Sequence, residues 1–337
     1  MKKISLISFL LLAVILLSSC DLMGNVIAVE SSGTEMEPVV VTDEQGSAVT
    51  DSEGSVVTEI PSADTTPSDD QYDIEFTSRD VSCEYSSDNA STVTFSSSAA
   101  TCSGSGVSAS GTQVSITAAG TYIISGSCPS GSITVNAPDD AKIQLVLNGL
   151  TLSNPNGPAI FIKAAHKVFI TTSEVSENTL SDGENYTATD GNTSLDAAIF
   201  SRADLTLNGK GTLTVNGRMS HAIVSKDDLV IGGGTLVVSS VKTGIYGKDC
   251  VKIAAGNITV QSGSDGIKSD NSKDTSRGFI YIMGGTISIN AGKEGLQAET
   301  LLRIDGGNIS IIAAGIPLKY TEIARNGGNV TANGVSV

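Results

Sequence analysis

The stretch GIYGKDCVKIAAGNITVQSGSD, residues 244–265, decides the fold because neighbouring stretches repeat its spacing of aliphatic residues. Within it, aliphatic and polar residues alternate over short runs, and Gly- or Asp-rich breaks separate the runs. Alternation of this kind is typical of β-strands with one buried face, so one repeat predicts three short strands. The matching aliphatic sets of three copies are Ile223, Leu229, Ile231, Leu236 and Val238; Ile245, Val251, Ile253, Ile258 and Val260; Leu296, Leu302, Ile304, Ile309 and Ile311.

Five copies align on a small residue followed by an aliphatic one. The pairs are Ala198-Ile199, Ala222-Ile223, Gly244-Ile245, Gly266-Ile267 and Gly295-Leu296, with spacings of 24, 22, 22 and 29 residues. Repetition at this length is typical of solenoids. The strands are rich in Ile, Val and Thr and lack the Leu/Asn signature of leucine-rich repeats, the competing solenoid. We therefore expect an all-β parallel β-helix of about 22 residues and three strands per coil, whose narrow core explains why the chain has no tryptophan.

The body of the protein is expected to span residues 72–337. Less regular coils come first, within residues 120–154, and a shortened coil with a cap comes last, from Gly315 to Val337. Two insertions interrupt the repeats, Ser173 to Asp196 and Ser272 to Gly278. Insertions in solenoids collect on one face and often shape a binding surface.

Residues 1–20 resemble the signal peptide of a bacterial lipoprotein. Lys2 and Lys3 precede an apolar run from Ile4 to Leu17, which is too short to span a bilayer. The run ends on LSSC, which resembles a lipobox, so Cys20 is the expected lipidation site. We expect an exported protein held at the cell envelope or cell surface by acyl chains alone. An ordinary signal peptide with an incidental cysteine is the alternative.

Residues 21–71 are predicted to form a disordered acidic stalk. The segment is rich in Ser, Thr, Asp and Glu and contains no Lys or Arg, so it cannot bury enough apolar surface to fold alone. Much of the formal net charge of −16 lies there. The body shows no basic surface, which argues against nucleic acid as a partner.

Four cysteines remain after Cys20. Export implies an oxidising compartment, so a disulfide bridge among Cys83, Cys102 and Cys128 is open. Cys250 lies inside a repeat and suits a small buried hydrophobic residue.

Stacking of the coils converts sequence columns into rows of side chains, and two of these rows are acidic. In the last two coils Asp265 stacks with Glu294, and Asp270 stacks with Glu299 beside Asn271. Opposed carboxylates about 5 Å apart repel. Calcium takes six to eight oxygens at roughly 2.3 to 2.6 Å, and twice that distance is about the coil spacing. We therefore expect calcium to bridge neighbouring coils; the alternative is that these residues only cap turns, with lysines as counter-ions.

Two further metal candidates, Asp227 and Asp249, lie in the middle coils. They follow Lys226 and Lys248 directly, so lateral salt bridges can neutralise them without a metal.

Several stretches together closely resemble a bacterial family of exported carbohydrate-binding domain proteins. They include GKGTLTVNG, SKDDLVIGGGTLVV, SGSDGIKSDN and AGKEGLQAETLLRIDGGNISI, and the resemblance covers about residues 72–337. It implies a right-handed parallel β-helix shaped like polysaccharide lyases, bound calcium, and binding of plant cell-wall polysaccharides such as cellulose and pectic polygalacturonate. The family's Asp-Gly-Ile is kept at Asp265-Gly266-Ile267 but not in the two preceding copies. The resemblance therefore carries calcium to Asp265, Asp270, Asn271 and Glu294.

The expected function is calcium-dependent polysaccharide binding by a monomer on the cell surface. With no tryptophan for stacking, the candidate glycan contacts are Tyr246, Lys268 and Arg277. A lyase would use a Lys or Arg near calcium to remove a proton, but no spacing singles out a base, and no catalytic residue is assigned. A calcium-dependent polysaccharide lyase and a protein-binding adhesin, a structural surface solenoid, remain the alternatives.

Overall fold

The computed structural model describes residues 39–40, 58–59 and 71–337. The expected signal peptide with Cys20, and most of the expected stalk, lie outside these residues. Within them, β1 (Val39–Val40) and β2 (Thr58–Glu59) form an antiparallel pair. The rest is all-β apart from one short helix, α1 (Ser78–Val81). No helix of the described residues has both the length and the apolar character needed to cross a bilayer.

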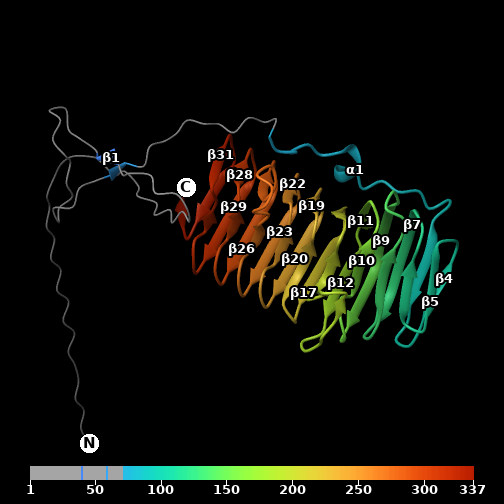
Figure 1. Ribbon diagram of the computed structural model, residues 1–337. Coiled ribbons are helices and arrows are strands. Elements are labelled where there is room, and N and C mark those ends of the chain that lie inside the picture. Colours follow the sequence, from blue (N-terminus) through green and yellow to red (C-terminus); the bar gives the residue numbers. More distant parts are fainter. Residues whose placement is uncertain (1–38, 41–57, 60–70) are drawn as a thin grey trace, which may run out of the picture. The chain divides into compact units, whose positions relative to one another are not determined.

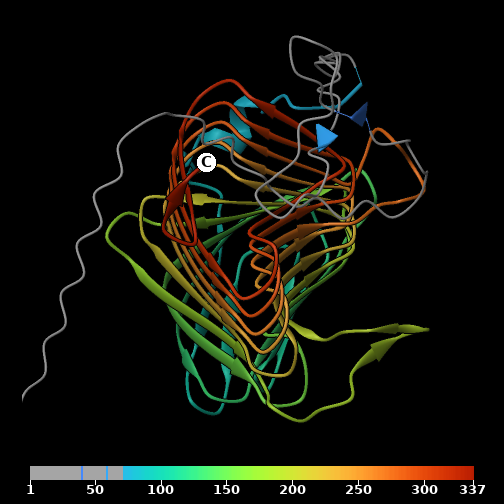
Figure 2. The same cartoon turned by 90° about the vertical axis from the view of Figure 1, so that its left-hand side faces the viewer.

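Most strands after residue 105 pair in parallel with the strand three places along the chain, which arranges them in three long rows (Figure 1). The first row is a ten-stranded sheet. The second and third rows are joined by the long strands β7 (Gly120–Cys128) and β9 (Lys142–Asn154), which contribute to both. Figure 2 shows the stack from its end, with the coils lying over one another. The prediction of an all-β fold with parallel strands is confirmed, and the long parallel sheets are consistent with a solenoid.

The first row consists of β5 (Val107–Ser110), β6 (Gln113–Ile116), β8 (Ser132–Asn136), β10 (Ile160–Ala164), β15 (Ala197–Ser201), β18 (His221–Ser225), β21 (Ile245–Gly247), β24 (Ile267–Ser269), β27 (Leu296–Ala298) and β30 (Leu318–Lys319). The second row continues from β9 through β11 (Lys167–Thr172), β16 (Asp204–Gly209), β19 (Asp228–Ile231), β22 (Cys250–Ile253), β25 (Phe279–Ile282), β28 (Leu301–Ile304) and β31 (Glu322–Arg325). The third row continues through β12 (Glu177–Asp182), β17 (Thr212–Gly217), β20 (Thr235–Ser240), β23 (Asn257–Ser262), β26 (Thr286–Ala291), β29 (Asn308–Ala313) and β32 (Asn329–Ala332).

Antiparallel pairs lie at both ends of the stack. At the N-terminal end β3 (Ser91–Phe95) pairs with β4 (Ala100–Ser103), and β5 pairs with β6. At the C-terminal end β33 (Val335–Ser336) folds back on β32. At the C-terminal end only β32 gains such a partner, and β30 and β31 are the last strands of their rows among the described residues.

The aliphatic columns expected from the sequence form the core. Ile223, Ile245, Ile267 and Leu296 pair in register along the first row and are fully buried. The second and third rows add equivalent ladders. Each such side chain contributes about 1.5 to 3 kcal/mol by leaving water, so the aliphatic ladders hold the coils together without large aromatic residues.

A glycine at the turn between the second and third rows recurs from coil to coil. Gly234, Gly256, Gly285 and Gly307 all have positive φ, between 88° and 117°. Residues with a Cβ rarely adopt this conformation. The repeat therefore requires glycine at this turn, which accounts for part of the high glycine content.

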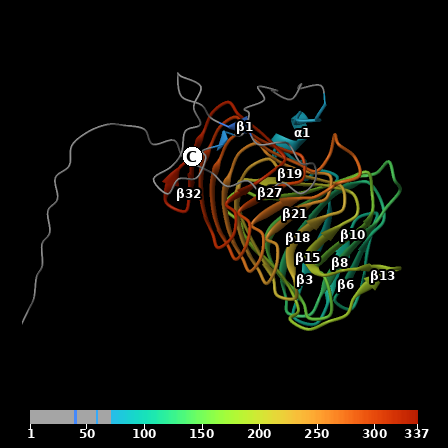
Figure 3. The ribbon, with the colours of Figure 1, turned by 60° about the vertical axis from the view of Figure 1, so that its left-hand side comes forward.

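The two insertions lie where strands meet, but the first is shorter than expected. Residues 177–182 of the predicted excursion form β12, a regular third-row strand, because Asn178 and Leu180 continue the inward columns. The true outgrowth is the segment after β12, with the hairpin β13 (Thr189–Asp190) and β14 (Thr193–Ser194) beside the first row (Figure 3). The second insertion, residues 272–278, connects β24 to β25 as expected.

Residues 71–86, which we call the strap, run across the outer face of the second row, and the sequence did not predict this. The Tyr72 ring packs on Phe279, the Asp80 carboxylate forms a 2.8 Å ion pair with Lys167 in β11, and the Glu84 carbonyl accepts from Gln144 in β9. The strap therefore passes from β25 back to β9, with α1 at its middle (Figure 1).

The four described cysteines are free thiols, and the disulfide left open by the sequence is not formed. Cys250 is buried inside β22, as expected for a small hydrophobic residue.

Candidate functional site

The polar residues singled out in the sequence gather where the first row turns into the second. The chain there follows a strand-like path, and successive side chains point to opposite sides. Lys248 and Asp270 point to the first-row side, whereas Asp249 and Asn271 point to the second-row side. The turn therefore carries two separate groups, which we call the paired face and the acidic corner.

The paired face consists of Tyr246, Lys248, Lys268 and Asp270. The Asp270 carboxylate accepts from the Tyr246 hydroxyl and the Lys248 ammonium, each at 2.7 Å, and lies 3.1 Å from Lys268 Nζ. Burial alone would raise the pKa of Asp270, but the hydrogen bonds from Lys248, Tyr246 and Lys268 outweigh it and lower the pKa. The salt bridge expected between Lys248 and its neighbour Asp249 is thus replaced by one to the next coil.

The Tyr246 ring is half-buried and lies near two lysines and a histidine. Lys226 Nζ lies 5.2 Å and Lys268 Nζ 6.0 Å from the ring centroid, and the His221 ring lies 6.2 Å away. Cations within about 6 Å of an aromatic face are attracted to it. Burial and the hydrogen bond to Asp270 raise the pKa of Tyr246, so the phenol stays neutral. The arrangement is an aromatic ring held by its hydroxyl between two lysines.

Asp265 and Glu294 lie side by side on neighbouring coils, as the sequence columns predict. Burial, reinforced by Glu294, raises the pKa of Asp265. Lysines approach both residues, Lys268 at 3.9 Å from Asp265 and Lys319 at 3.6 Å from Glu294. Glu299, expected in the same site, is exposed. The residues expected to bind calcium therefore do not converge on one point of the turn. Lysine ammonium groups lie beside three of them, Asp265, Asp270 and Glu294.

The acidic corner consists of Asp204, Asp227, Asp228 and Asp249. One carboxylate oxygen each of Asp204, Asp227 and Asp228 lie within 4.8 Å of one another. Burial, reinforced by the other three carboxylates, raises the pKa of Asp227 to about 6. Burial and then Asp228 raise the pKa of Asp204. Carboxylates crowded in this way favour a bound proton or a cation.

Arg277, on the insertion between β24 and β25, reaches into the acidic corner. Its Nη1 contacts the Asp249 carboxylate and lies 3.6 Å from Asp227 and 3.9 Å from Asp228. Asn271 donates to the other oxygen of Asp249 at 2.6 Å. Of the residues expected at a metal, Asp227, Asp249 and Asn271 thus meet here, with Arg277, an expected glycan contact, among them.

Asp204 and Asp228 were missed in the sequence, although a signal for them exists. Each directly precedes an inward residue, Leu205 or Leu229, that pairs in register across β16 and β19. Asp204 and Asp228 each lie six residues after the small residue of their copy, Ala198 or Ala222, so extending the column count by one position stacks the two carboxylates on neighbouring coils. The stretches SRADL and SKDDL show this correspondence directly.

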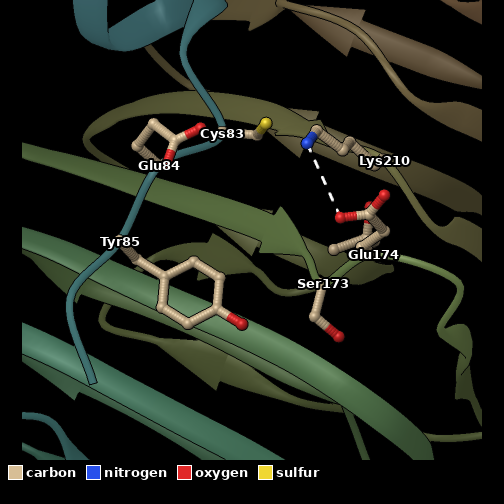
Figure 4. A pocket seen from close by; sticks show the side chains of 7 residues that line it. Cys83, Glu84, Tyr85, Ser173, Glu174 and Lys210 are labelled. Atoms are coloured by element: carbon tan, nitrogen blue, oxygen red, sulfur yellow. Dashed lines mark ion pairs between the residues drawn. The ribbon is translucent and has the colours of Figure 1, made fainter.

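Cavities lie beneath the strap. The largest beside the acidic corner, about 500 Å³, is lined by Asp204 and Asp228 together with strap residues and basic side chains of the second row. A smaller one of about 140 Å³ lies at the end of the strap between Tyr85 and Ser173, where Lys210 pairs with Glu174 at 3.6 Å (Figure 4). Ligand pockets usually measure about 300 to 1,000 Å³, so the smaller cavity is a poor candidate site.

Comparison with known proteins identifies relatives of this chain. The family model for carbohydrate-binding domain-containing proteins matches residues 110–336. A carbohydrate-binding domain-containing protein of Acetivibrio thermocellus is 36% identical over 122 residues, which are 36% of this chain and 43% of that protein. The alignment thus spans less than half of that relative.

A solved structure is similar over most of the body. It is the polysaccharide lyase-like protein from C. thermocellum, determined as a gadolinium derivative. The TM-score is 0.64 and the sequence identity 31%, and the match covers 73% of this chain and 95% of the other. The likeness therefore extends over nearly the whole of that neighbour.

Proposed function

Because the chain belongs to the family of carbohydrate-binding domain-containing proteins, we propose that it is a polysaccharide-binding protein of the cell surface whose binding depends on calcium. The observation that carries the proposal is the paired face, where an ordered tyrosine lies among lysines. Its ligand is a glycan with carboxylate groups, of the pectic or uronate type. Protein cations pair with such carboxylates, and an aromatic ring packs against the apolar face of a sugar.

Calcium fits the acidic corner better than the site expected from the sequence. Carboxylate oxygens within 4.8 Å of one another can surround one ion at roughly 2.3 to 2.6 Å. Asp204, Asp227 and Asp228 would hold it, and Asp249 lies beside them. A bound calcium ion would neutralise the corner and offer open positions to a glycan carboxylate. The related solved structure is a gadolinium derivative, and gadolinium, like calcium, is a hard cation that prefers oxygen ligands.

The finer fold assignment and the cellular location are part of the same proposal. Three parallel rows in register support a right-handed parallel β-helix, the architecture implied by the family resemblance. The lipobox-like LSSC supports acyl anchoring at Cys20 and export to the cell envelope. We expect a monomer, in which the antiparallel strands β5 and β33 cover part of the edges of the stack.

A polysaccharide lyase is the second candidate, and Lys226 favours it. Loss of hydration lowers the pKa of Lys226, which lies 5.2 Å from the Tyr246 ring. A lysine with a lowered pKa is suited to remove a proton. Lys268 and Arg277 are poor bases in comparison, because both pair with carboxylates.

A depletion assay tests the proposal and separates it from its alternatives. The purified protein is mixed with insoluble polygalacturonate, in calcium or in chelator, while ultraviolet absorbance reports unsaturated products. Calcium-dependent depletion without new absorbance is the expected result. Rising absorbance would make the protein a lyase, whereas no depletion and no absorbance would contradict polysaccharide binding and favour a protein-binding adhesin.

A further inference from the structure

The outward face of the third row is uncharged from β17 to β32, in a chain whose formal net charge is −16. Alternate residues of β17, β20, β23, β26, β29 and β32 point away from the core and are partly or fully exposed. All of these outward residues are Thr, Ser, Asn or Gln, except Val237 and Ile312. We call this surface the polar sheet face; its strands lie side by side in Figure 1.

The polar sheet face is regular in two directions. Asn257 pairs with Thr286, Thr259 with Ser288, and Gln261 with Asn290, all in register. Neighbouring strands lie about 4.8 Å apart, and alternate residues of a strand are separated by about 6.6 Å. The hydroxyl and amide groups therefore form a two-dimensional array instead of converging on a pocket.

Hydrogen bonds order the side chains towards the ends of this face and leave its centre available. Asn329 donates to Asn308 at 2.9 Å, and Ser239 donates to Asn216 at 2.8 Å. In the part of the chain that the structure describes, Thr259 and Ser288 make no side-chain hydrogen bond to protein. Their hydroxyls, like amides, both donate and accept. The centre can thus exchange bound water for hydroxyl groups of a ligand.

We propose that the polar sheet face binds a neutral, hydroxyl-rich polysaccharide that presents an ordered flat surface, as cellulose does. A neutral ligand suits this face because neither partner has to lose the hydration shell of a charge. A uronate does not suit it, since the face carries no cation to pair with a carboxylate. The inference rests on the proposed polysaccharide binding and gives neutral glycans a site separate from the paired face.

The same array has a purely structural reading, in which the Thr, Ser and Asn ladders only stabilise the stack. Cross-strand pairs of this kind each contribute about 0.2 to 1 kcal/mol. That reading predicts that changes at the centre of the face alter stability and leave glycan retention alone. Retention and stability therefore have to be measured on the same variants.

The test places two charges at the centre of the face, as the double variant Thr259→Lys, Ser288→Lys, and measures depletion by microcrystalline cellulose and by polygalacturonate. Retention on cellulose should weaken at least about tenfold, since each 1.4 kcal/mol lost is tenfold, whereas retention on polygalacturonate should not weaken, because the added lysines attract its carboxylates. Ser108→Lys, an exposed site on β5, is the matched control and should keep both. The double variant Thr259→Val, Ser288→Ala removes the hydroxyls without adding charge. It is the second test of cellulose retention and replaces the lysine variant if that variant unfolds.

Three outcomes overturn the inference. If both centre variants are retained on cellulose like the parent protein, the polar sheet face is not the site. If the parent binds polygalacturonate but not cellulose, this inference fails and the proposed function stands. If the parent binds neither glycan, both fail together.

Discussion

The paired face and the acidic corner arise from the same turns, yet they differ in how their charge is balanced. At the paired face one carboxylate, Asp270, is held by two lysines and a tyrosine, and its pKa is lowered. At the acidic corner Arg277 is the one cation that the described residues pair with Asp227 and Asp249, and the pKa of Asp227 is raised to about 6. A row of acidic residues in a sequence therefore does not identify a metal site. Neighbouring lysine and arginine side chains decide whether the negative charge of the carboxylates is neutralised.

The largest effect should come from removing charge at the acidic corner. Asp204→Asn combined with Asp228→Asn should weaken calcium binding at least about tenfold, because the charge and number of ligands set calcium affinity. Isothermal calorimetry on the purified protein measures this. Glu299→Gln is the control, since Glu299 is exposed and outside the corner. If Glu299→Gln weakens calcium binding and the Asp204→Asn, Asp228→Asn variant does not, the calcium site is not at the acidic corner.

Removing Arg277 should act on the corner in two opposite ways. Arg277→Ala should raise calcium affinity a few-fold, because the guanidinium competes for Asp227 and Asp249. In chelator the same variant should be less stable by about 1 kcal/mol or less, because the pairs are partly exposed and screened. Arg277→Lys keeps the charge, so its calcium affinity and its stability should both lie between those of the wild type and those of Arg277→Ala. Lower calcium affinity in Arg277→Ala would show that Arg277 supports the ion instead of competing with it.

The pH dependence of stability should reveal the raised pKa of Asp227. The folded value is about 6 and the unfolded value about 3.9, so the native state holds this proton more tightly. Stability relative to Asp227→Asn should thus be highest below about pH 4, fall as the pH rises to about 6, and level off above it. Denaturant unfolding of both proteins in chelator measures the difference. A difference that does not change between pH 4 and 6 would show that the corner is not crowded with charge.

The smallest effect is expected at the paired face. Tyr246→Phe keeps the ring and removes the hydroxyl that donates to Asp270 at 2.7 Å, so stability should fall by about 0.5 to 1.5 kcal/mol. Because the ring and the lysines remain, retention on polygalacturonate should change little. Lys248→Met is the companion variant, and it should weaken that retention more. If Tyr246→Phe loses more retention than Lys248→Met, the hydroxyl and not the cation contacts the glycan.

The sequence was a good guide to what repeats. Inward columns such as Ile223, Ile245 and Ile267 could be counted because strand side chains alternate and each coil restarts the pattern. The second insertion and the C-terminal cap followed from departures from that pattern. The first insertion was overestimated because β12 begins only after several irregular residues.

Contacts between distant segments could not be counted in this way. Asp80 bonds to Thr206, 126 residues away, and this strap contact leaves no periodic trace in the sequence. The partner of Lys248 was also unpredictable, because adjacent side chains diverge and the ammonium reaches Asp270 on the next coil. The sequence predicted only part of the acidic corner, since Asp227 was singled out and Asp228, its neighbour, was not.

The most direct measurement joins the two regions in one assay. Wild-type protein and the Asp204→Asn, Asp228→Asn variant are each depleted on polygalacturonate, with calcium and with chelator. We expect calcium to increase retention of the wild type and to have little effect on the variant, because the ion bound at the acidic corner links protein and glycan. Equal calcium dependence in both proteins would contradict this link and place the functional ion, if any, elsewhere.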